Sequence, residues 1–319
     1  MLRTLRNGGI VLNKDDVVVA GHYPLKLLWS LLRKGADRFV PEHVSLNPTN
    51  RCQLKCSYCC VSERDMKMPD MSKDMFLEIM GELQSFGRLK AVTLTGGGEP
   101  TLHPHFEGFV AYLTTCNIKV GLVTNGLNLS SFPIFRQQGM FDWIRVSFDG
   151  ERKELPLIPE GARVGFSWMW REVDRENRNL WELVRMAKEG KITHLRIGND
   201  ILSPSPIPSV FQERPNVIVQ DRQVSKRGSG QCWLGLLHPK VDVDGEFYPC
   251  CGVQYAVDKV GRKYPKENLG LRDLSSFMDR VKNQEPFCGG MCRYCFYWKS
   301  NNLLSSVKAV HHLESKFFI

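Results

Sequence analysis

The chain has 319 residues, of which 42% are hydrophobic and 24% are charged. These are the values of an ordinary globular protein, long enough for one large domain or for a large domain and a small one. The most apolar stretch near the N-terminus, 25–32, is interrupted by Lys26 and Ser30, so we expect neither a signal peptide nor a membrane span.

The formal net charge of +9 leaves two interpretations open. It fits an anionic partner, such as nucleic acid or a phosphorylated substrate, and it fits a basic but solvated surface. The eleven cysteines are more informative. In a chain of this length without a signal peptide they indicate metal-binding or catalytic thiols in a reducing compartment. We therefore expect a cytoplasmic protein.

The first 42 residues are predicted to form an extension of the main domain. Residues 10–12 and 17–20 have the apolar character of a β-hairpin, with the polar turn 13–16 between them. Residues 24–35 follow as a short amphipathic helix that begins at Pro24 and ends at Gly35. No chemical role follows from this segment.

Residues 43–222 alternate between strands and helices. The predicted strands are 43–47, 91–94, 119–124, 143–148, 164–170 and 194–197, and the predicted helices are 72–86, 103–115, 132–138 and 176–189. Repeated strand–helix units predict an α/β fold with a parallel sheet, here a partial six-stranded barrel of the TIM type. Chemistry is then expected at the carboxyl ends of the strands. Residues 223–319 hold six of the eleven cysteines and are predicted to form a small domain stapled by metal.

Three cysteines follow the first of these strands closely. Cys52, Cys56 and Cys59 form the spacing Cys-x3-Cys-x2-Cys, with Tyr58 before the last. Thiolates suit iron–sulfur clusters or zinc, and a closed structural site needs four protein ligands, so three leave an open position. A zinc loop completed by Cys60 or a distant residue is the plainer alternative.

The pattern resembles the signature of the radical SAM superfamily. In that family the three cysteines hold a [4Fe-4S] cluster, and the fourth iron chelates S-adenosylmethionine (SAM). The resemblance covers about residues 43–298 and implies the partial barrel predicted above. It also implies a flavodoxin- or ferredoxin-type electron donor.

The second strand ends in a glycine-rich turn that strengthens this resemblance. Glycines let a backbone approach a ligand, and a carboxylate beyond them can hold an ammonium group. The turn matches the family's GGEP motif, which binds the amino group of SAM. Its residues are Gly97, Gly98, Glu99 and Pro100.

Polar residues also close the following strands. The resemblance implies ribose contacts from Thr124, Asn125, Ser147 and Asp149, and adenine contacts near Ile197. Capping of turns is an equally reasonable role for each polar residue.

The C-terminal cysteines resemble the auxiliary-cluster modules called SPASM and twitch. Their spacing is Cys232-x12-Gly245-x4-Cys250, followed by Cys292-x2-Cys295, and the hairpin 240–249 with its turn at Asp244-Gly245 would bring two thiolates together. The run of cysteines is too short for a full SPASM module, so the single-cluster twitch form fits better. Structural zinc is the competing interpretation.

Four cysteines remain outside these two sets. Cys116 lies at a predicted helix end and is expected to serve packing. Cys60 and Cys251 lie beside cluster ligands. There a thiol could donate a hydrogen atom to a substrate radical, as in radical epimerases, or could have no separate role. Cys288 could replace one auxiliary ligand.

The function implied by the resemblance is reductive cleavage of SAM to a 5′-deoxyadenosyl radical, which abstracts a hydrogen atom from an unactivated C–H bond. The basic charge and the cationic run 222–227 lean toward an anionic substrate such as a nucleotide or nucleic acid, with oxidation, epimerisation or rearrangement as the outcome. Peptide or aminoglycoside modification is the alternative. A zinc-binding, nucleic-acid-associated protein is a hypothesis of another class.

Overall fold

The computed structural model describes most of the chain. It covers residues 38–59, 61, 64–148, 151–158, 163–199, 205–220, 230–250, 273–287, 301–302 and 304–305, together with the backbone of residues 3–4, 10–11 and 288.

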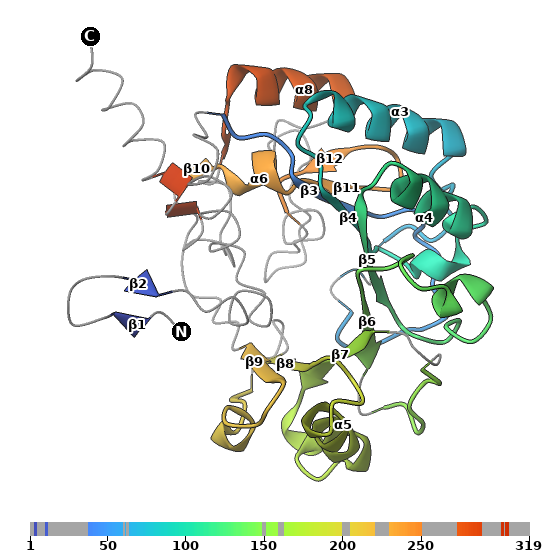
Figure 1. The fold of residues 1–319 in the computed structure, drawn as a ribbon, viewed down its shortest axis with the longest axis vertical. Coiled ribbons are helices and arrows are strands. Elements are labelled where there is room, and N and C mark those ends of the chain that lie inside the picture. The colour runs from blue at the N-terminus through green and yellow to red at the C-terminus, as the bar shows by residue number, and fades with distance from the viewer. Residues whose placement is uncertain are drawn as a thin grey trace.

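A nine-stranded sheet forms the centre of the molecule (Figure 1), in the order β12-β11-β3-β4-β5-β6-β7-β8-β9. Every neighbouring pair is parallel except β11 and β12. The strands are β3 (His43–Leu46), β4 (Ala91–Leu94), β5 (Lys119–Thr124), β6 (Trp143–Phe148), β7 (Val164–Trp170), β8 (Leu195–Asn199), β9 (Val217–Gln220), β11 (Lys240–Val241) and β12 (Phe247–Tyr248). The predicted α/β fold with a mostly parallel sheet is confirmed.

The α-helices of the described residues lie between strands, and the first three connect neighbouring parallel strands of the sheet. They are α3 (Lys73–Ser85), α4 (Phe106–Thr115), α5 (Arg178–Lys188), α6 (Leu234–Leu237) and α8 (Leu274–Asn283), with single 3₁₀ turns η1 (Pro100–Leu102), η2 (Pro133–Arg136), η3 (Glu172–Asp174) and η4 (Ser209–Phe211). The helix α3 begins where its sequence predicts, because the hydroxyl of Ser72 accepts a hydrogen bond from the backbone N–H of Met75.

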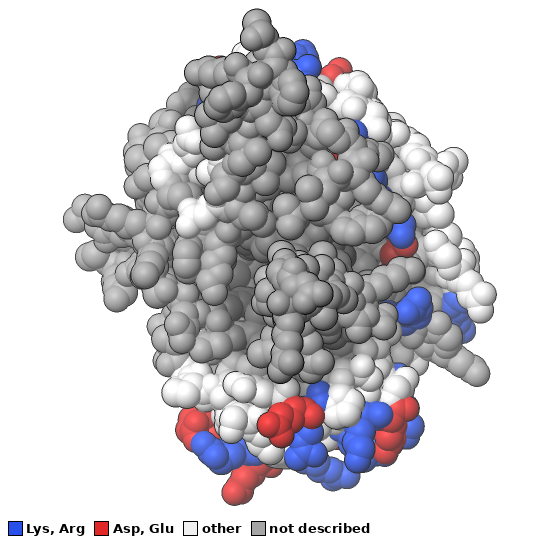
Figure 2. Space-filling model, turned by 60° about the vertical axis from the view of Figure 1, so that its left-hand side comes forward, with Lys and Arg blue, Asp and Glu red and all other residues white. Residues whose placement is uncertain are grey.

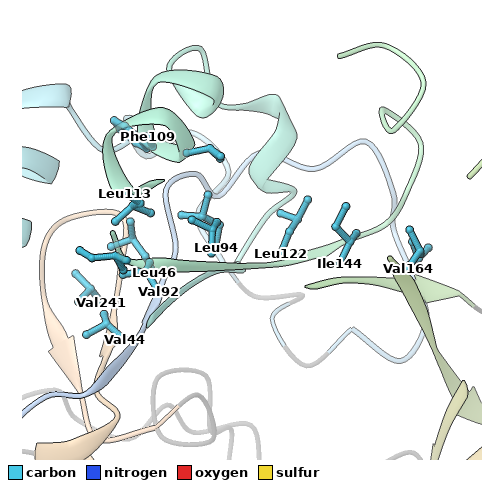
Figure 3. Close-up of a cluster of buried hydrophobic side chains, with 14 of the residues drawn as sticks. Val44, Leu46, Val92, Leu94, Phe109, Leu113, Leu122, Ile144, Val164 and Val241 are labelled. Atoms are coloured by element: carbon cyan, nitrogen blue, oxygen red, sulfur yellow. The ribbon is translucent and has the colours of Figure 1, made fainter. Parts of the chain in front are cut away.

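The two faces of the sheet differ in chemistry. Successive side chains of a strand point to opposite faces. One set, drawn in Figure 3, forms one apolar layer together with Phe109 and Leu113 of α4. It consists of Val44, Leu46, Val92, Leu94, Leu122, Ile144, Val164 and Val241. The alternate set is largely polar and includes Ser45, Thr93, Arg145, Ser167 and Arg196.

The sheet extends beyond the six predicted strands at both edges. The strand β9 adds a seventh parallel strand beside β8, and β11 pairs in parallel with β3. The predicted hairpin around Asp244-Gly245 is present as β11 and β12, and Gly245 has the positive φ of +82° that its turn needs. The region predicted as a separate small domain therefore contributes two strands to the main sheet.

Two further strand pairs lie outside this sheet. β10 (Gln231–Cys232) pairs with β13 (Phe287–Cys288), and β1 (Arg3–Thr4) pairs with β2 (Ile10–Val11). The first strand of the predicted hairpin, 10–12, is thus paired with residues 3–4, which the sequence did not single out. The other predicted strand, 17–20, and the predicted helix 24–35 lie outside the described residues.

Candidate functional site

The predicted cysteine loop leaves the carboxyl end of β3 and is fixed at its root by buried polar groups. The amide nitrogen of Asn47 donates to the side-chain oxygens of Asn50 (2.9 Å) and Asp242 (2.6 Å). The backbone N–H of Asn47 donates to the carbonyl of Val241 at 2.9 Å. The hairpin β11–β12 therefore anchors the start of the loop.

The three cysteines of the loop are half-buried. Alternate positions face inward, with Cys52 and Cys56 half-buried and Gln53 and Lys55 exposed. Ser57 and the half-buried Tyr58 form a turn. The backbone N–H of Cys59 closes this turn by donating a hydrogen bond to the carbonyl of Cys56 at 3.1 Å. Cys60 lies outside the described residues.

This set of donors fits an iron–sulfur cluster better than a mononuclear metal. Within the described ranges, no group of three or more His, Cys, Asp or Glu side chains is placed to hold a single metal ion. A four-iron cluster binds each thiolate to a different iron, so its ligands stand further apart than those of one zinc ion. Three half-buried thiols on one loop suit such a cluster, and they would leave its fourth iron without a ligand from this set.

The glycine-rich turn after β4 packs directly on the backbone of this loop. The N–H of Gly98 donates to the carbonyl of Thr49 (3.0 Å), and the N–H of Glu99 donates to that of Arg51 (2.8 Å). A Cβ atom on Gly98 would lie 2.2 Å from the carbonyl oxygen of Arg51. Glycine is required here because the two backbones touch.

The carboxylate of Glu99 is buried, and four donors converge on it. Its Oε1 accepts from the hydroxyls of Thr101 and Thr124, both at 2.7 Å, and from the N–H of Thr101 at 3.2 Å. Its Oε2 accepts from the N–H of Asn125 at 2.7 Å. Glu99 therefore joins the ends of β4 and β5, and Oε2, with two lone pairs, has room for one more donor.

Two side chains donate to cysteine sulfurs of the loop. The amide nitrogen of Asn125 lies 4.0 Å from the Sγ of Cys52 and 3.1 Å from the side-chain oxygen of Gln53. The guanidinium of Arg64 lies 3.5 Å from the Sγ of Cys59. The sequence predicted Asn125 as a ribose contact but gave no signal for Arg64, whose position depends on the path of the loop.

The remaining predicted residues lie at the ends of β6 and β8. The carbonyls of Ser147 and Asn125 both accept from the guanidinium of Arg152, the latter at 2.6 Å. Ile197 is fully buried in the apolar layer, so its side chain serves packing, and only its backbone remains for an adenine contact. Asp149 lies outside the described residues.

The carboxylate of Glu151 links the cysteine loop to the end of β7, and the sequence did not predict this contact. The carboxylate of Glu151 accepts from the hydroxyl of Ser57 (2.8 Å) and from Arg171 (2.7 Å). Burial alone would lower the pKa of Arg171. The hydrogen bonds and negative charges of Asp174 and Glu151 have the larger combined effect, so the pKa of Arg171 is raised. The guanidinium is therefore a fixed charge at this edge.

Only part of the predicted auxiliary site lies within the described residues. Cys232 on β10 and Cys250 after β12 are half-buried, and the side-chain amide of the buried Asn301 lies 3.5 Å from the Sγ of Cys232. The backbone of Cys288 pairs with Gln231. Cys251, Cys292 and Cys295 lie outside the described residues. Cys116 ends α4 and packs against the apolar layer, as predicted.

Residues 46–199 match the family model described as the Radical SAM superfamily. This stretch contains the cysteine loop, the Glu99 turn and the ends of β5 and β6. It is a radical SAM domain.

Known proteins resemble this chain over different shares of its length. An S-adenosylmethionine-dependent nucleotide dehydratase from Flammeovirga pacifica is 32% identical over 31% of this chain and 35% of its own. The putative peptide biosynthesis protein YydG of Bacillus subtilis is 21% identical over 65% of this chain and 68% of its own. SuiB of Streptococcus suis, solved with its precursor peptide SuiA, has a TM-score of 0.54 at 13% identity, covering 81% of this chain and 68% of SuiB.

The chain spans about a third or less of the curated relatives that it matches at 32–34% identity. The SuiB comparison shows the fold alone. The radical SAM domain is thus shared, while activity and substrate have to be argued separately.

Charges of both signs are intermixed on the described surface outside the radical SAM site. Figure 2 shows Lys and Arg beside Asp and Glu at the lower end of the face it presents. On α5, Arg185 pairs with Glu182 and Glu189. On this described part of the surface, the mixture of charges is typical of a solvated face and not of a basic stripe that binds nucleic acid. No described helix has the length and apolar character needed to cross a membrane.

Proposed function

We propose that the protein is a radical SAM enzyme that modifies a peptide. One observation carries the enzymatic part: the half-buried thiols of Cys52, Cys56 and Cys59 lie on a loop whose backbone contacts the turn holding Glu99. The thiols would hold a [4Fe-4S] cluster, and the polar strand ends beside them would hold SAM. When bound, the cluster and SAM supply a 5′-deoxyadenosyl radical that removes a hydrogen atom from a C–H bond.

The chain's own residues have distinct tasks in this scheme. Glu99 fixes the ends of β4 and β5 and offers Oε2 to the ammonium group of SAM. Gly98 lets this turn lie on the cysteine loop. Glu151 and Ser57 hold the outer side of the loop against Arg171. Together these contacts fix the relative positions of the cluster thiolates and the SAM-binding turn before either ligand arrives.

A peptide substrate is better supported than a nucleotide. The putative peptide biosynthesis protein YydG matches about two thirds of both chains, whereas the nucleotide dehydratase matches about a third. The fold is also that of SuiB, which was solved with a precursor peptide. We keep a nucleotide as the second candidate, because the dehydratase has the higher identity over its shorter match.

We further propose a second [4Fe-4S] cluster, of the twitch type, on Cys232, Cys250, Cys292 and Cys295. The half-buried thiols of Cys232 and Cys250 and the amide of Asn301 beside Cys232 support it. A flavodoxin- or ferredoxin-type protein would supply the electron.

The first experiment measures iron, sulfide and SAM cleavage after anaerobic reconstitution. The wild type is compared with a Cys52/Cys56/Cys59→Ala variant, and the expected iron content falls from roughly eight to roughly four per chain with complete loss of SAM cleavage. Zinc in place of iron in the wild type would overturn the proposal and restore the zinc-protein hypothesis.

The substrate class is tested by the same assay with added substrates. A peptide library is expected to raise 5′-deoxyadenosine formation above the substrate-free level, with a mass change in the peptide. Nucleoside triphosphates serve as the comparison. Stimulation by these alone would replace the peptide with a nucleotide.

A further inference from the structure

We propose that Arg64 and Asn125 raise the reduction potential of the cluster on Cys52, Cys56 and Cys59 by donating N–H hydrogen bonds to two of its thiolates. The proposal rests on the function proposed above. Both are positioning and tuning residues, since each acts through a cysteine and not on the substrate.

Arg64 is held in place by several acceptors on the loop that it serves. Its Nε donates to the carbonyl of Asn50 at 2.8 Å, and its Nη1 donates to the carbonyl of Val61 at 2.9 Å and to the Sγ of Cys59 at 3.5 Å. These bonds span the loop from before its first cysteine to beyond its last. The guanidinium therefore sits at a fixed place beside Cys59.

Asn125 is fixed even more completely. Its N–H donates to Glu99, and its carbonyl accepts from Arg152. Its Oδ1 accepts from the N–H of Leu127 at 2.9 Å, which leaves Nδ2 directed at Gln53 and at the Sγ of Cys52. The first and last cysteines of the loop thus each have a donor from a different part of the chain.

Such donors favour the reduced cluster. Reduction adds negative charge that spreads onto the thiolate sulfurs, and hydrogen bonds to those sulfurs are among the features that set the potentials of iron–sulfur clusters. Arg64 adds a positive charge in a half-buried environment, where electrostatic interactions are stronger than in water. Losing either donor should make the cluster harder to reduce.

The test is an EPR-monitored redox titration of reconstituted protein, following the signal that changes when SAM is added. Arg64→Gln removes the charge, Arg64→Lys keeps it, and Asn125→Asp keeps the acceptor for Leu127 while replacing the donor. At a fixed potential, the ratio of reduced to oxidised cluster should fall about tenfold in Arg64→Gln and Asn125→Asp, the effect of losing one charge-assisted hydrogen bond. In Arg64→Lys this ratio should fall less, because the positive charge is kept.

The matched control is Arg185→Gln on the exposed face of α5, which should titrate as the wild type does. Wild-type potentials in both Arg64→Gln and Asn125→Asp would overturn the inference while leaving the enzyme proposal intact. A wild type without a SAM-sensitive signal would overturn both. If Arg64→Gln binds no iron, Arg64→Lys and Asn125→Asp decide the question.

Discussion

The hydroxyl of Thr124 donates to the buried carboxylate of Glu99 at 2.7 Å and thereby joins the end of β5 to the end of β4. The same hydroxyl oxygen accepts from the N–H of Gly126 at 3.0 Å. Thr124 and Glu99 lie beside the cysteine loop. Their hydrogen bond therefore helps to position the site and also stabilises the sheet.

Thr124→Val should therefore destabilise the protein by about 1–3 kcal/mol, because it keeps the shape but leaves a buried carboxylate with one donor fewer. The measurement is urea unfolding. Thr124→Ser keeps the hydroxyl and loses only one methyl group, so it should cost less. Equal stability of the two variants would show that the hydrogen bond contributes nothing.

Gly98→Ala should prevent the close contact between the glycine-rich turn and the cysteine loop. The added Cβ would meet backbone atoms of Arg51, Asn50 and Thr49 at 2.2–2.6 Å, and backbone cannot rotate away. We expect a loss of about 3 kcal/mol or more, at the upper end of overpacking costs, with reduced iron binding.

The control for Gly98→Ala is Gly81→Ala within α3, where nothing lies within 4 Å of the added Cβ. This change should stabilise the protein by about 0.5–1 kcal/mol, because alanine favours the helix. Both variants are compared by thermal unfolding and iron content. Normal iron binding in Gly98→Ala would contradict the close packing of the two segments.

Much of the fold follows from local sequence. The strands β3 to β8 are marked by apolar runs, and α3 by Ser72 and its apolar stripe. The strand β9 was overlooked, although Val217-Ile218-Val219 is β-branched, because it follows a Pro/Ser-rich segment that resembles a linker. The helix α8 was overlooked as well, although Asp273 caps it and Phe277 and Val281 share one face.

The site was predictable in its residues but not in its contacts. The spacing of the three cysteines and the position of Glu99 can be read directly from the amino-acid sequence. The convergence of Thr124 and Asn125 on Glu99 depends on the register of β4 and β5, and the place of Arg64 depends on the loop returning on itself. Such contacts arise between segments and leave no local pattern.

Cys232→Ala with Cys250→Ala should lower the iron content by roughly four per chain, if these thiols hold an auxiliary cluster. The signal that responds to SAM should persist, because the cysteine loop is unchanged. Asn301→Leu tests the same site more gently, since it removes the donor to Cys232. Full iron content in the double variant would remove the auxiliary cluster from the mechanism.

His194 should make the protein less stable in acid. Its half-buried ring lies over Gly165, where an added Cβ would be 2.3 Å from the ring, and burial together with the charges of Arg145 and Arg196 lowers the pKa of His194 to about 4. The unfolded chain has the ordinary value of about 6.5, so between these values the unfolded state binds more protons than the folded state. Stability therefore falls as the pH drops from about 6.5 through about 4, by roughly 3 kcal/mol at most.

His194→Gln removes this titration, so its unfolding free energy should fall less than that of the wild type between about pH 7 and about pH 4. Arg145→Met should have a smaller effect in the same direction, because it removes one charge that opposes protonation of His194. Urea unfolding across this range gives the stability differences, and NMR titration of the His194 ring gives its pKa directly. Parallel stability curves for the wild type and His194→Gln would mean that the ring is protonated equally in both states, and that solvent reaches it between the two arginines.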